Sequence, residues 1–122
     1  ISDLTGIEDF TDLIEFNCSF NQLISLDLTP HTVLTDLDCS NNQLTCLNIR
    51  NGINAGLTDF WAYNNPNLIC IEVDDALWAS INWTTIIGNV DAQMSFMFCF
   101  INFLFFDKLL FIKFKKAVLI PL

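Results

Sequence analysis

The chain has 122 residues, 52% of them hydrophobic, and a formal net charge of −9 at pH 7. This length allows one domain. Up to residue 96, Arg50 is the only basic residue against thirteen acidic ones. Because phosphate backbones are bound by clustered Lys and Arg, this composition argues against a nucleic-acid partner.

Residues 13–73 contain three copies of one pattern, L-x-x-L-x-C-x-x-N-x-L-x-x-L-x-L. The second copy starts at residue 34, 21 residues after the first, and the third starts at residue 57 with one extra residue near Pro66. Residues 1–12 resemble a partial turn, in which Ile7 takes the place of Leu28. A match in register at seven positions indicates a repeat rather than chance: Leu13, Phe16, Cys18, Asn21, Leu23, Leu26 and Leu28 recur as Leu34, Leu37, Cys39, Asn42, Leu44, Leu47 and Ile49.

Inward side chains two residues apart predict two short extended segments in each turn. One turn is too small to bury its own apolar face, so stacked turns build a continuous core. The pattern is typical of a right-handed, β-rich leucine-rich-repeat solenoid with short parallel strands and coil connections, here spanning residues 1–73. We expect the column Asn21, Asn42 and Asn65 to bond the backbone of its own turn and of the adjacent turn.

The cysteines predict a structural role rather than a metal site. Cys18 and Cys39 share an inward column with Ala62, which indicates small core side chains. Cys46 and Cys70 share another column, and neighbouring strands would place them within disulfide range. No C-x-x-C pair occurs, and we expect the single histidine, His31, to be a solvated turn residue.

The outward columns of the first strand of each turn are the candidate binding surface. We expect one column partly to face the sides, and the whole face to be flat or convex without a pocket; its candidate residues are Glu15, Asp36, Asp59, Asn17, Asp38, Trp61 and Tyr63. The acids are interpreted mainly as a solvated face, with binding of calcium or of a basic partner as the alternative. Trp61 replaces Asn17 and Asp38 of the earlier turns, which favours a contact with protein or sugar. The competing interpretation is that Trp61 covers the end of the array.

The segment 74–96 is predicted to cap the array. Asp74 or Asp75 can begin a short helix by capping its first turn. Leu77, Trp78 and Ile81 form an apolar side that we expect to lie over the third turn.

The turns LDCSNNQLTCLNI and the closing stretch NNPNLICIEVDD resemble bacterial cell-surface leucine-rich-repeat proteins with roughly 21-residue repeats, many of them exported by the type IX secretion system. The resemblance implies an extracellular or cell-surface protein attached to the outer membrane. Relatives tend to close with F-S-x-x-C, which implies a bridge between Cys70 and Cys99. They also carry a signal peptide and a C-terminal sorting domain, so we expect this chain, which starts with Ile, to be a fragment or a trimmed product.

Residues 97–122 depart from that pattern, since they are apolar and carry four of the five basic residues. We favour a shifted reading frame. One alternative is a membrane anchor over 96–112 followed by lysines, weakened by Asp107 and Lys108, and another is an apolar element packed on the repeats. Membrane contact is expected only if this tail is genuine.

No nucleophile elbow, phosphate loop or zinc-protease motif occurs in the sequence. We therefore predict a non-catalytic module that recognises a protein or a glycan, with no cofactor other than a candidate calcium ion. The alternatives are a structural spacer that displays another domain and a membrane-anchored repeat protein. All of these rest on fold and resemblance, because one fold serves many functions.

Overall fold

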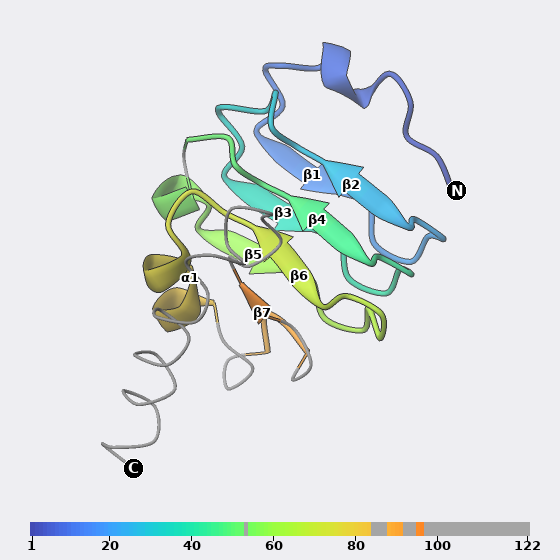
Figure 1. Ribbon diagram of the computed structural model, residues 1–122. Coiled ribbons are helices and arrows are strands. Elements are labelled where there is room, and N and C mark those ends of the chain that lie inside the picture. Colours follow the sequence, from blue (N-terminus) through green and yellow to red (C-terminus); the bar gives the residue numbers. More distant parts are fainter. Residues whose placement is uncertain (53, 84–87, 92–94, 97–122) are drawn as a thin grey trace, which may run out of the picture.

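The computed structural model describes residues 1–52, 54–83, 88–91 and 95–96. The predicted apolar tail, 97–122, and with it Cys99, lies outside the described residues. Two parallel sheets face each other, and the chain alternates between them (Figure 1). One sheet has the order β1-β3-β5 and the other β2-β4-β6-β7.

The elements are short and recur once per turn. The described elements are η1 (Ile7–Asp9), β1 (Glu15–Asn17), β2 (Ser25–Asp27), β3 (Asp36–Asp38), β4 (Cys46–Asn48), η2 (Asn54–Gly56), β5 (Asp59–Trp61), β6 (Cys70–Glu72), α1 (Ala76–Asn82) and β7 (Ser95–Phe96). Each strand pairs with the equivalent strand of the next repeat, so that Phe16 is the register partner of Leu37, and Leu37 is that of Phe60. This confirms two short parallel strands per turn, with short connections and one helix at the C-terminal end of the stack.

The core lies between the two sheets because each three-residue strand turns only its middle side chain inward. All the inward positions of the second and third copies are buried: Leu34, Leu37, Cys39, Leu44, Leu47, Ile49, Leu57, Phe60, Ala62, Leu68, Ile71 and Val73. In the first copy, Leu13 and Phe16 are only half-buried. They lie next to the irregular residues 1–12, which carry no strand to pack against them.

The Asn column joins successive turns where the chain bends inward. The Asn42 amide donates to the carbonyl of Cys18 in the previous turn at 2.9 Å and to that of Cys39 in its own turn at 3.2 Å. Its oxygen accepts from the backbone N–H of Leu23 at 3.0 Å. Asn65 repeats this set of contacts one turn later. The buried backbone groups of each corner are thereby satisfied.

A second polar column lies at the other corner, and it corrects the expectation for His31. The His31 side chain is fully buried rather than solvated. Its Nε2 lies 3.0 Å from the carbonyl oxygen of Ile7, and the Asn51 amide donates to the His31 carbonyl at 3.0 Å. Each side chain thus bonds the backbone of the turn before it. His31 is buried because it lies between two turns, contacting the Ile7 carbonyl, which also accepts from the Phe10 N–H, on one side and the Asn51 amide on the other.

The helix covers the end of the array with only part of the predicted side, since Trp78 is half-buried and packs against the core. Asp75 caps α1 by accepting from the Trp78 backbone N–H at 2.9 Å, but Leu77 and Ile81 are exposed. Ala79 is buried, and Trp83, which follows the helix, packs on Phe60 with ring centroids 4.5 Å apart. The small Ala side lets the helix approach closely. This leaves the Trp83 ring to cover the last core face.

Polar groups of residues 88–91 continue the hydrogen bonding where another turn would follow. The Asn89 carbonyl accepts from Ala62 N–H at 2.8 Å, as Trp61 does from Cys39 N–H at 2.9 Å. The Asp91 carboxylate accepts from the backbone N–H groups of Asn64 and Asn65 at 3.0 and 2.8 Å. These contacts satisfy the donors of the third turn in the absence of a strand.

Replacing Asn42 with Ala is expected to lower the free energy of unfolding by about 2–4 kcal/mol. The change leaves the Leu23 N–H and the Cys18 carbonyl buried without their partner. Urea unfolding followed by circular dichroism measures the loss. Gln43→Ala, an exposed neighbour in the same turn, is the control and should stay close to the parent protein. Equal stability of the two variants would show that the Asn column contributes nothing.

Burial raises the pKa of two core thiols, with the Asp38 carboxylate adding to the effect. The pKa of Cys18 rises to about 12, and that of the fully buried Cys39 rises well above its usual value, with the neighbouring Cys18 as a further cause. Because the folded protein holds these protons more tightly than the unfolded chain, the stability they provide is complete below about pH 9. It is lost as the pH rises from there toward 12.

In a Cys46→Ser background, the unfolding free energy should therefore fall between about pH 9 and 11, at up to about 1.4 kcal/mol per pH unit for each buried thiol. The Cys18→Ala, Cys39→Ala double variant should fall less steeply. Ala62 already occupies this column in the third turn, so Ala fits the position. Parallel slopes for the two proteins would contradict this account.

Candidate functional site

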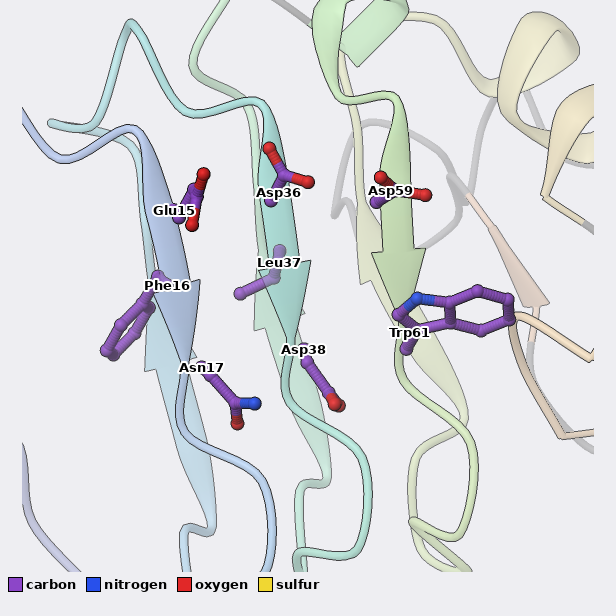
Figure 2. Close-up of a pocket in the computed structure, with 8 residues that line it drawn as sticks. All are labelled: Glu15, Phe16, Asn17, Asp36, Leu37, Asp38, Asp59 and Trp61. Carbon is purple, nitrogen blue, oxygen red and sulfur yellow. The ribbon is translucent and has the colours of Figure 1, made fainter.

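The outward residues of β1, β3 and β5 form one continuous face, which we call the acidic face: Glu15, Asn17, Asp36, Asp38, Asp59 and Trp61. Figure 2 shows two rows across the three strands, one of Glu15, Asp36 and Asp59 and the other of Asn17, Asp38 and Trp61. Both rows lie on the same side of the sheet, because they flank the inward middle residue of each strand. The first row therefore belongs to this face rather than to the sides of the stack.

The second row is held in place by local hydrogen bonds. Asp38 accepts from the backbone N–H and the hydroxyl of Ser40 at 3.0 and 2.6 Å, and Asn17 accepts from Ser19 in the same way. These Asx-type contacts fix the side chains at the point where each strand ends. In the first row, Asp36 accepts from the Thr35 hydroxyl. Within the described residues, the side-chain carboxylates of Glu15 and Asp59 make no hydrogen bond or ion pair.

The acidic face is hollowed rather than flat, which corrects the sequence-based expectation. A shallow, open hollow of about 450 Å³ is lined by both rows together with Phe16 and Leu37. Its edge is formed by Trp61, whose ring extends beyond β5 on the side away from β3 (Figure 2). The hollow thus lies over the short polar side chains of β1 and β3 and is bordered at β5 by Asp59 and Trp61.

Trp61 lies on the surface, with 37% of its side-chain area exposed. Its ring meets the half-buried Tyr63 edge-on, with centroids 6.3 Å apart. The end of the array is covered instead by Trp83, which is 4% exposed and contacts both Phe60 and Trp78. Other aromatic residues therefore close the core, and Trp61 stays on the surface at the edge of the hollow.

The second sheet carries the cysteines whose pairing the sequence left open. Cys70 is disulfide-bonded, whereas Cys46 is free, so the bridge between these two is absent. The implied partner, Cys99, lies outside the described residues. Arg50 forms an ion pair with Glu72 at 3.7 Å on this sheet.

In the described part of the chain, no group of three or more His, Cys, Asp or Glu side chains is arranged to hold a metal ion. Nor does any helix of that part have the length and apolar character to cross a membrane.

The chain matches no family model, and the searches found no curated protein and no solved structure similar to it. Sequence reasoning missed the residues that occur only once. Trp83, Asn89 and Asp91 complete the end of the stack beside the acidic face, but none of them belongs to a repeated column. The one sequence signal for them is the pair Asn89 and Asp91, because Asn and Asp side chains often bond nearby backbone N–H groups.

Replacing Asp36 with Asn should stabilise the protein by a few tenths to about 1 kcal/mol at low ionic strength. Asp36 lies between Glu15 and Asp59 on neighbouring strands, so the change removes two like-charge contacts at once. Urea unfolding in about 0.02 M and about 0.5 M salt measures the gain, which should shrink as salt screens the charges. Asp12→Asn, an exposed change away from this face, is the control. A gain that is equal for both variants or independent of salt would contradict the repulsion.

Proposed function

We propose that this protein is a non-catalytic recognition module that binds a protein or a glycan on the acidic face. The observation that carries this proposal is the exposed Trp61 ring at the edge of a hollow lined by carboxylates. Neither the repeat nor the end of the array needs a Trp here, since the equivalent positions are Asn17 and Asp38 and the last core face is covered by Trp83. Large exposed aromatic rings supply contact area at low entropic cost.

The polar groups of the hollow suit either class of ligand. The carboxylates of Glu15 and Asp59 are unpaired and can accept hydrogen bonds from sugar hydroxyls or from Lys and Arg side chains. The Trp61 ring can stack on the apolar face of a sugar or on a guanidinium group. Asn17 and Asp38 of the second row are already held by hydrogen bonds to Ser19 and Ser40, so little of their side-chain freedom would be lost on binding.

We further propose that the fold is a right-handed leucine-rich-repeat solenoid of the bacterial cell-surface type. The pattern of seven positions, the stacked parallel strands and the Asn column support this assignment. An extracellular or surface-attached location follows from the same resemblance. A protein that displays its strand face outside the cell can use it for recognition, as solenoids commonly do.

Trp61→Ala is expected to weaken binding at least tenfold, the loss typical of a central aromatic contact. The probes are a panel of soluble oligosaccharides and a Lys- and Arg-rich peptide, each titrated by calorimetry against the parent protein and the variant. Phe20→Ala is the matched control, because Phe20 is 79% exposed but does not line the hollow. It should bind like the parent.

The Glu15→Lys, Asp59→Lys double variant separates the two ligand classes. Binding of the cationic peptide should be lost, whereas binding of a neutral oligosaccharide should fall only modestly. If no probe binds, or if Trp61→Ala and the charge reversals leave all binding unchanged, the acidic face is not a recognition site. The structural spacer would then be the better account.

A further inference from the structure

The second sheet places a free thiol beside a disulfide. Cys46 on β4 and Cys70 on β6 are register partners in neighbouring parallel strands. Cys46 is free and Cys70 is already bonded, and both side chains are half-buried. A thiol next to a disulfide sulfur is the arrangement that thiol–disulfide exchange requires. We propose that Cys46 is a site of intramolecular thiol–disulfide exchange, at which it displaces the present partner of Cys70.

The sheet geometry allows the new bond with the backbone in place. Neighbouring strands lie about 4.8 Å apart, and bridged cysteines have Cα atoms about 4.4–6.8 Å apart. Register partners in a parallel sheet project from the same side. The other free cysteines of the described residues, Cys18 and Cys39, are buried and follow strands of the opposite sheet. Cys46 is therefore the described free thiol that can reach Cys70.

The exchange needs no oxidant. The Cys46 thiolate attacks the Cys70 sulfur, the bond from Cys70 to its present partner breaks, and that partner leaves as a thiolate that takes up a proton. One disulfide and one thiol are present before and after the step. The result is a bridge between β4 and β6 in place of the present disulfide of Cys70.

The surrounding charges hold this reaction back near neutral pH. Burial raises the pKa of the Cys46 thiol, and Glu72 on β6 and Asp27 on β2 raise it further. The Arg50 guanidinium lies 3.7 Å from Glu72 and partly offsets its charge. Because only the thiolate attacks, the rate should increase about tenfold per pH unit until the thiol is ionised. The disulfide of Cys70 is thus preserved at neutral pH and becomes exchangeable in alkali.

The experiment follows the disulfides of the full chain without reductant. Dilute protein is held at about pH 7, 8 and 9, quenched in acid at intervals, and digested with pepsin, whose low pH stops further exchange. Mass spectrometry should show a peptide linking Cys46 to Cys70, formed about tenfold faster at each higher pH. The original Cys70 linkage should be lost in equal amount.

Two variants make the result specific. Cys46→Ser should keep the original linkage at every pH, and Glu72→Gln should accelerate exchange several-fold at about pH 8 by removing a neighbouring negative charge. The proposal is overturned if no Cys46–Cys70 peptide exceeds the Cys46→Ser background at about pH 9. It is equally overturned if the new linkage joins two chains, which would show as dimers whose yield rises with protein concentration.

Discussion

Every turn of this chain is too short to satisfy its own buried backbone, and the Asn column resolves this constraint. A turn of about 21 residues has two tight corners facing the core, where N–H and carbonyl groups point into an apolar interior. Asn42 supplies a donor and an acceptor that join the turn before it to its own turn. Without these bonds, the apolar side chains alone would favour collapse but not this register. The stacked strands, and with them the acidic face, depend on the Asn column.

The same constraint explains what is found at the two ends of the stack. At the corner opposite the Asn column, His31 and Asn51 bond the preceding turn in a similar way. At the C-terminal end, residues 88–91 take the place of a first strand: the Asn89 carbonyl accepts from the Ala62 N–H, and the Asp91 carboxylate accepts from two backbone N–H groups. At the N-terminal end, the Ile1 amino group donates to the Asn21 side chain, and the Gln22 N–H donates to the Ile1 carbonyl. One turn later, Leu23 makes the same two contacts with Asn42 and Gln43. Different residues thus satisfy the groups that a continuing repeat would satisfy.

How far the sequence predicts this structure depends on whether a position recurs. The inward columns and the Asn column recur, so periodicity alone located them and the two strands of each turn. His31 and Trp83 occur once, and a single residue carries no periodic signal to separate a buried polar link from a solvated turn. The spacing of Leu77 and Ile81 predicted a shared helix side. It could not show that the small side of Ala79 packs inward instead, because that choice depends on the space left by Trp83.

On the acidic face and at Cys46, the effect of neighbouring carboxylates depends on the group beside them. In both places, parallel strands in register bring like groups within about 5 Å. On the acidic face Glu15 and Asp59 are exposed and Asp36 and Asp38 are half-buried, so water and salt screen much of their repulsion. At Cys46 the neighbouring carboxylates and partial burial favour the neutral thiol, which protects the disulfide beside it. Neighbouring carboxylates therefore act differently in the two places: on the acidic face they repel one another, and at Cys46 they raise the pKa of a thiol.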